Sequence, residues 1–318
     1  MREGQPRRDN LYYAANLIGL SVIGYRLVAI FLQAALSAAL DANLPGASAQ
    51  NPVGIPVAAA ALINCLATAV NLALPILWLR RSARPLALAP LALRRPGRVA
   101  AAALPLFLCY TTLCSVAANL MRMLLGLGGY VPPASTTLPE GAGPLALSFL
   151  SICVIPAIGE ELFFRGTIQR LLTPYGDWFA IIVSSVLFAL LHADLSQIPS
   201  IFALSLFLGY IVAAYGNVAD AMLLHFFNNA SGFLQLWARQ QMDGTNVMAL
   251  TAILFTFYFG AGLTVLIVLL RRRRPLPKLP RYPTRKNRMG RTERLLSAPF
   301  FTITLLLLIL TCLMEYFR

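Results

Sequence analysis

The chain has 318 residues, of which 58% are hydrophobic and 12% charged, and a formal net charge of +14. A globular domain has about 45–50% apolar and about 25% charged residues, so this composition excludes an ordinary water-soluble enzyme or binding domain. Apolar runs of about 20 residues, the length that crosses a bilayer as a helix, recur along the chain. We therefore expect an all-α, polytopic transmembrane helical bundle of eight or nine spans in a lipid bilayer.

The apolar runs predict helical spans, in chain order, at 11–40, 55–79, 99–125, 145–171, 177–194, 197–215, 218–239, 247–270 and 296–316. Transmembrane strands are excluded because they would show short segments of alternating apolar and polar residues. The first run is too long for the core of a signal peptide, so we expect it to remain as an anchor.

Two segments between the predicted spans are strongly basic, a loop at 80–98 and a linker at 271–294. Positive residues that flank spans mark the cytoplasmic side, so the excess charge indicates membrane orientation and not nucleic-acid binding. We expect both segments and the N-terminus in the cytoplasm, and the richness in arginine and alanine favours a bacterial cell membrane. The spans divide into N-terminal helices (1–144), a core (145–240) that carries the candidate site, and C-terminal helices (241–318).

Neighbouring carboxylates, Glu160 and Glu161, lie late in the fourth predicted span together with Arg165. Glu161 and Arg165 are four residues apart, so on a helix they share a face and can pair. Glu160 lies about 100° round the helix and is left free. A carboxylate in apolar surroundings accepts a proton more readily than one in water, as a general base must. The alternative is that all three lie near the cytoplasmic headgroups, because Arg170 follows closely.

The chain has two histidines, and both fall in the same region as the carboxylates. His192 ends the fifth span, four residues after Phe188, and His225 precedes Asn229 by four residues in the seventh. An imidazole and a carboxamide on one helical face can both donate to an oxyanion. Taken singly, each histidine also fits an ordinary core residue. Asp194 follows His192 at a span end, where we expect it to be solvated or to orient the histidine.

A metal site is an alternative use of these side chains, because Glu160, His192 and His225 would supply three ligands, as in catalytic zinc sites. However, the sequence lacks the His-Glu-x-x-His spacing of zinc metalloproteases, and its five cysteines lie in apolar runs without ligand spacing. We predict no cofactor, with a divalent metal on those three residues as the open alternative. Arg26 and Arg122, inside predicted spans, are expected to snorkel or to pair within the bundle.

In chain order the polar residues form three motifs, which are Glu160-Glu161 to Arg165, Phe188 to His192, and His225 to Asn229. This set resembles the CAAX-processing and bacteriocin-processing (CPBP) intramembrane endopeptidases, an Abi-like family that includes the type II CAAX prenyl endopeptidases. The resemblance covers about 145–235. It implies a helical bundle with a polar cavity between the motif-bearing helices, open to the membrane and the cytosol.

The resemblance also implies a role for each motif. Glu160 would activate the attacking water with help from His192, while His225 and Asn229 would stabilise the oxyanion. The ion pair of the first motif would support them, and no covalent intermediate would form. The substrate would be a membrane-anchored protein or peptide.

Two other functions fit parts of the pattern. A non-catalytic family member would act as a membrane scaffold or as a bacteriocin-immunity protein. A proton-coupled transporter would use the buried carboxylates as a relay, although the sequence shows no inverted repeat. The intact motifs favour the enzyme, because a scaffold needs none of these side chains together.

Overall fold

The computed structural model describes residues 8–40, 56–86, 93, 95–132, 137–273, 277–279 and 290–317. The two basic segments predicted at 80–98 and 271–294 therefore lie partly outside the described residues. Within the described ranges every regular element is a helix, as the composition predicts.

The long helices agree with the predicted spans. They are α1 (Arg8–Leu40), α2 (Val57–Ser82), α3 (Arg98–Leu127), α7 (Asp177–Leu191), α8 (Ile198–Tyr215), α9 (Val218–Gln241), α10 (Gly244–Arg271) and α12 (Pro299–Tyr316). The fourth predicted span is one helical path made of α4 (Ala142–Phe149), the π-helical turn η2 (Leu150–Val154), α5 (Ile155–Phe163), a second π-helical turn η3 (Phe164–Gln169) and α6 (Arg170–Leu172). The 3₁₀ turns are η1 (Arg84–Leu86) and η4 (Thr173–Tyr175), and a short helix, α11 (Arg291–Leu296), precedes α12.

The protein is a multi-pass membrane protein built as a polytopic helical bundle, since seven helical segments among the described residues are long and apolar enough to cross a membrane. The helices α7 and α9 are not among the seven. With 15 residues, α7 is about 22 Å long and shorter than a hydrocarbon core of about 30 Å. The longer α9 carries His225, Asn228 and Asn229, and these polar side chains lower its hydropathy. The number of crossings therefore stays a prediction.

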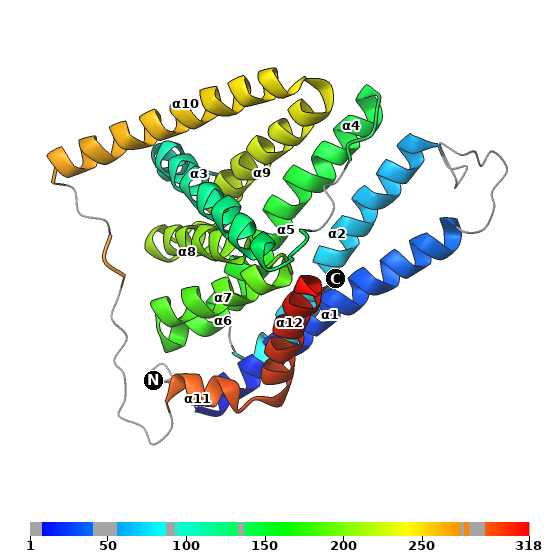
Figure 1. The fold of residues 1–318 in the computed structure, drawn as a ribbon. Helices are drawn as coiled ribbons and strands as arrows, with labels where there is room; N and C mark the ends of the chain where they lie inside the picture. Colours follow the sequence, from blue (N-terminus) through cyan, green and yellow to red (C-terminus); the bar gives the residue numbers. More distant parts are fainter. Residues whose placement is uncertain are drawn as a thin grey trace.

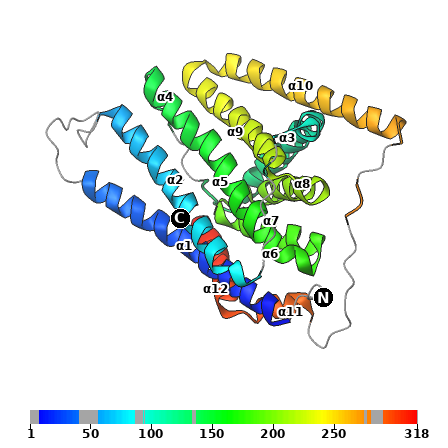
Figure 2. The ribbon, with the colours of Figure 1, turned by 180° about the vertical axis from the view of Figure 1, so that it is seen from behind.

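The helical path α4–α5–α6 runs through the middle of the bundle (Figures 1 and 2). Contacts join α5 to α2 and α9, and α7 packs on α8. On one side α1 lies between α2 and α12, so the first and last helices of the chain are neighbours. On the other side α3 packs on α8, α9 and α10. The motif-bearing helices α5, α7 and α9 are thereby enclosed by helices from both ends of the chain.

Close helix packing depends on glycine at two places. A Cβ atom on Gly19 of α1 would lie 2.4 Å from the backbone of Phe300 in α12, and one on Gly262 of α10 would lie 2.2 Å from Cys109 Cβ in α3. Small residues let helices approach in membranes, where apolar burial gives little driving force. These glycines therefore fix how α12 and α10 dock onto the rest of the bundle.

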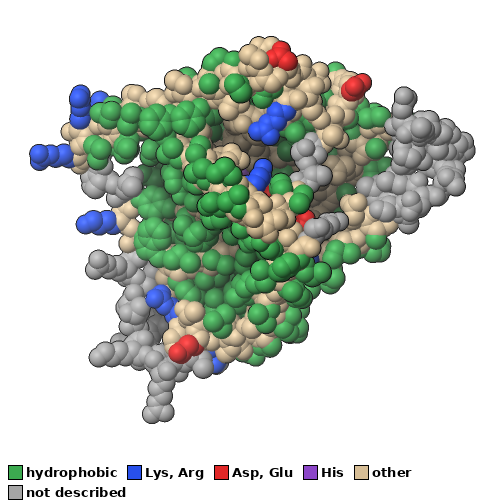
Figure 3. All heavy atoms as spheres, in the orientation of Figure 1, with side chains coloured by type: hydrophobic (Ala, Val, Ile, Leu, Met, Phe, Trp, Pro, Cys, Tyr) green, Lys and Arg blue, Asp and Glu red, His purple; other side chains and the backbone are tan. Residues whose placement is uncertain are grey.

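The surface fits a lipid environment. Hydrophobic side chains cover the middle of the face in Figure 3, and several Lys and Arg side chains gather at its left and lower edges. Near the middle the face is hollowed, and charged side chains reach the surface there. Apolar residues on α10 such as Phe257 and Leu270 are 66% and 69% exposed. In water such exposed apolar surface would promote aggregation, whereas in a bilayer it contacts lipid chains.

Candidate active site

Two π-helical turns bracket α5, the helix that carries the carboxylates. Such turns often occur at functional sites. Each turn presents a backbone carbonyl to another helix: Ile152 O accepts from Asn229 Nδ2 at 3.3 Å, and Gly166 O accepts from Arg80 Nη1 at 3.3 Å. The turns therefore attach the carboxylate-bearing helix to α9 on one side and to α2 on the other.

Glu161 and Arg165 form an ion pair with 2.9 Å between Oε1 and Nη1, and both side chains are fully buried. Arg165 Nη2 also donates to the backbone oxygen of Ser205 at 3.1 Å and to its hydroxyl oxygen at 2.8 Å. The guanidinium carbon lies 4.7 Å from the centre of the Phe188 ring. The spacing of four residues thus brings the predicted pair together, and Ser205 of α8 supplies two further acceptors for the cation.

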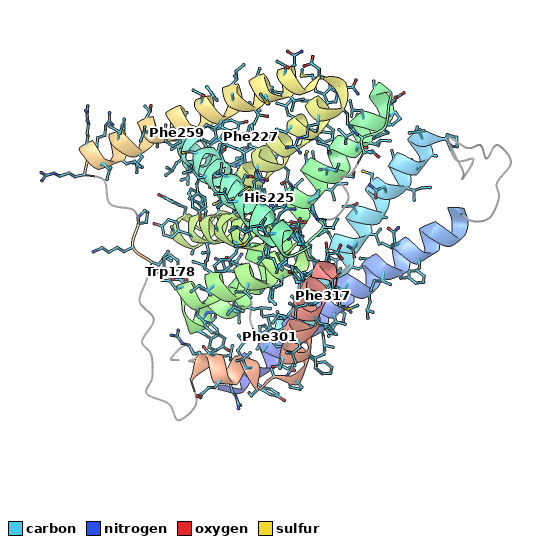
Figure 4. All side chains as sticks on the ribbon, viewed as in Figure 1. Trp178, His225, Phe227, Phe259, Phe301 and Phe317 are labelled. Carbon is cyan, nitrogen blue, oxygen red and sulfur yellow. The ribbon has the colours of Figure 1, made fainter. Side chains whose placement is uncertain are left out.

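His225 lies between the two carboxylates. Its Nδ1 is 2.9 Å from Glu161 Oε1, and its Nε2 is 3.9 Å from Glu160 Oε2. Because a carboxylate oxygen accepts, Nδ1 carries the hydrogen. The side chain of His225 is 5% exposed and that of Glu160 17% exposed. Figure 4 places His225 in the middle of the bundle. The imidazole therefore connects the buried ion pair to the more accessible carboxylate.

His192 differs from His225 because it is exposed, at the end of α7. Its Nδ1 lies 2.8 Å from the backbone oxygen of Phe188. A carbonyl oxygen only accepts, so Nδ1 donates, and Nε2 of the neutral ring keeps a free lone pair. The Phe188 ring contacts both imidazoles, with centroid distances of 4.9 Å to His192 and 5.9 Å to His225. The second and third motifs therefore meet at Phe188.

Asn229 lies one helical turn after His225 on α9 and is partly buried. Its amide donates to Ile152 O, and its Oδ1 lies 3.4 Å from the donating amide nitrogen of Asn228. The structure thus directs the Asn229 amide toward η2, next to the carboxylate-bearing helix. Asn228, ranked below Asn229 from its position on the helix, contacts it directly.

The loop after α7 is built around Asp194, which the sequence predicted to be solvated and which is instead 6% exposed. Asp194 Oδ1 accepts from Tyr130 Oη at 2.8 Å, from Ser196 N at 3.0 Å and from Ser196 Oγ at 2.6 Å. Gln197 donates to Oδ2, and Arg122 Nη2 is 3.7 Å from that oxygen. Burial alone would raise the pKa of Asp194, but hydrogen bonds from Ser196, Gln197 and Tyr130 outweigh it and hold the pKa below its usual value.

Helix α1 reaches the same end of α7. Arg26 donates to the backbone oxygen of Leu191, the residue before His192. Tyr25 stacks on Phe163 of α5 with 6.2 Å between ring centres. Arg26 therefore pairs within the bundle, as predicted, and it does so beside the second motif.

The proposed metal ligands do not fit a three-ligand site. No group of three His, Cys, Asp or Glu side chains in the described part of the chain converges so that it could hold a metal ion. Glu160 and His225 are neighbours, but His225 Nδ1 is occupied by Glu161 and only Nε2 faces Glu160.

These features define a polytopic membrane protein whose core helices place His225 beside Glu160, with the Phe188 ring in contact with both His225 and His192. Residues 142–231 match a family model described as type II CAAX prenyl endopeptidase Rce1-like. The match supports membership of the CPBP family, which is the family that the three motifs resemble. No curated protein and no solved structure was found to match the chain.

Sequence reasoning missed several residues that complete the site. Ser205 and Tyr130 carry no pattern that separates them from other hydroxyl residues, and their partners lie 40 and 64 positions away in the chain. Phe188 was noted only for its spacing to His192, although its ring contacts Arg165 and both histidines. Such roles depend on contacts between helices, which the spacing within one helix does not contain.

Proposed function

We propose that the protein is an intramembrane endopeptidase that hydrolyses a peptide bond of a membrane-associated protein or peptide through a water activated by Glu160. The observation that carries the proposal is the position of the Glu160 carboxylate, 3.9 Å from His225 Nε2 and at the accessible edge of a buried ion-paired cluster. A scaffold has no use for a partly exposed carboxylate beside an imidazole, whereas a hydrolase needs a base beside a donor.

In the proposed reaction, Glu160 takes a proton from water while the water oxygen attacks the carbonyl carbon of the scissile bond. His192 accepts a hydrogen bond from the same water at Nε2, its free lone pair. The charge that develops on the carbonyl oxygen is stabilised by donors on His225 and Asn229, each worth about 2.7–4 kcal/mol in comparable oxyanion sites. When the C–N bond breaks, Glu160 returns the proton to the leaving amine. The products are an amine and a carboxylic acid, which ionises by releasing its proton to solvent.

The buried pair supports this chemistry through charge. His225 donates to Glu161 from Nδ1, so it donates to an oxyanion only when Nε2 also carries a hydrogen. A protonated His225 and Arg165 then balance the charges of Glu160 and Glu161. The ion pair thus acts on the substrate through His225.

Asn229 must change partner to act. Its amide donates to Ile152 O in the absence of substrate, at 3.3 Å. Long hydrogen bonds of this kind are common before a substrate is bound and are exchanged in the reacting complex. The proposal therefore includes a small rotation of the Asn229 side chain from η2 to the substrate oxygen.

The test is a cleavage assay with purified protein in lipid vesicles and membrane-anchored peptides of varied sequence. Glu160→Gln keeps the shape of the side chain and removes the base, so turnover should fall by about 10²–10⁴. Glu140→Gln is the matched control, because Glu140 is exposed and lies outside the site. His225→Ala should also lose turnover. Full activity of Glu160→Gln would overturn the mechanism.

A further inference from the structure

We infer that Asp194 is a positioning residue for His192 and acts through the loop that joins α7 to α8. The inference rests on the proposed function in one respect, namely that His192 assists the attacking water. The contacts of Asp194 are to Tyr130, Ser196, Gln197 and Arg122, and not to the motif residues. It fixes the backbone that carries the imidazole.

The backbone after His192 needs such support. Ala193 has φ of 58°, in the left-handed region, which is unfavourable for a residue with a Cβ atom. The last turn of α7 is also tightened, since His192 N and Ala193 N donate three residues back, to Ala189 O and Leu190 O at 3.2 Å each. A helix end in this conformation persists only where its surroundings hold it.

Asp194 fixes the backbone on the C-terminal side of His192. Its two carboxylate oxygens take hydrogen bonds from Tyr130, Ser196 and Gln197, and Arg122 adds its charge at 3.7 Å. Tyr130 and Arg122 belong to α3 and the segment after it, so the carboxylate attaches the α7–α8 loop to a different part of the bundle. A buried carboxylate with this many donors has one orientation.

Arg26 holds the other side, through Leu191 O. The backbone on either side of His192 is therefore fixed by residues from α1 and from the α3 end. The imidazole itself is exposed, and its hydrogen bond runs to Phe188 O of its own helix. The position of His192 Nε2 is consequently set by the backbone of the loop more than by contacts of the ring.

A displacement of about 1 Å can cost a reaction about 10²-fold. Asp194→Asn keeps the volume of the side chain and removes its charge. It also replaces one acceptor oxygen by an NH2 group, which faces groups that donate and therefore cannot accept their hydrogen bonds. We expect kcat to fall by about tenfold to hundredfold with little change in KM. Tyr130→Phe removes one donor only and should have the same effect to a smaller degree. Asp243→Asn, at the exposed start of α10, is the matched control.

A double-variant comparison separates positioning from general damage. In a His192→Ala background, Asp194→Asn should cause no further loss of kcat, because its effect is exerted through the imidazole. A structural role would instead reduce the activity of both backgrounds by the same factor. Equal losses in the two backgrounds would overturn the inference.

A spectroscopic readout is independent of activity, because the chain has two histidines. Protein labelled at the histidine rings should give two NMR signals, which the His192→Ala variant assigns. Asp194→Asn should shift or broaden the His192 signal and leave that of His225 in place. An unmoved His192 signal would refute the positioning role. If the wild type cleaves no peptide while the His192 signal still moves, the proposed function fails and the positioning role stands.

Discussion

The buried ion pair gives the sharpest prediction about stability. Arg165→Met keeps most of the apolar length of the side chain and removes the guanidinium. Glu161 is then left fully buried, with His225 as its remaining partner on Oε1. The substitution also removes two hydrogen bonds to Ser205, at 3.1 and 2.8 Å, and the contact with the Phe188 ring.

Removing one partner of a buried pair costs about 3–5 kcal/mol, because the other charge stays buried without compensation. We expect a loss of unfolding free energy in that range for Arg165→Met. Replacing both charges, in Glu161→Gln/Arg165→Met, should bring stability back to within about 1–2 kcal/mol of the wild type, since no buried charge is then left over. The double variant should therefore be more stable than the single one.

The cysteines provide the assay. Cys65, Cys109, Cys153 and Cys312 are buried, so a thiol-reactive dye in detergent micelles reports unfolding as they become accessible. Arg239→Met is the matched control, because Arg239 is exposed at the end of α9 and its replacement should change stability by less than about 0.5 kcal/mol. The reasoning is refuted if the single variant unfolds like the wild type, or if the double variant is no more stable than the single one.

Three further predictions follow from the packing and the site. Gly19→Ala should lower the free energy of unfolding by about 1–3 kcal/mol, because its Cβ would lie 2.4 Å from the backbone of Phe300. Gly24→Ala is the control on the same helix. Its Cβ would meet nothing within 4 Å, so the thiol assay should show no loss of stability. Asn229→Ala should reduce kcat by about 10²–10³ in the cleavage assay, with Asn228→Ala much milder. A chelator should leave cleavage unchanged, and a loss that zinc restores would favour the metal alternative.

Much of the fold was predictable because membrane spans are specified locally. A run of apolar residues long enough for the bilayer must be helical, and the spacing within one helix shows which side chains share a face. The helices and the pairing geometry of Glu161 and Arg165 follow from these two rules. Both rules describe single helices and give no information on contacts between helices, so the position of His225 between the two carboxylates could not be deduced from them.

Two features of the structure were missed for physical reasons that the sequence does not display. Asp194 was expected in solvent because span ends usually are, yet donors from α3 and its following segment bury it. The π-helical turns within the fourth span were not predicted, because such turns have no recognisable composition and depend on tertiary contacts such as those of Asn229 and Arg80. In both cases the deciding partners are distant in the chain.

The π-helical turns also bear on how the gene can change. A π turn amounts to one extra residue in an α-helix, so a single-residue deletion inside η2 or η3 can be absorbed by a return to α geometry. A deletion in α5 before Glu160 would rotate the carboxylates by about 100° relative to the preceding helix. Length variation among relatives should therefore fall at 150–154 or after Arg165 in the second turn, and avoid the residues between them, where the Glu161–Arg165 spacing must be kept.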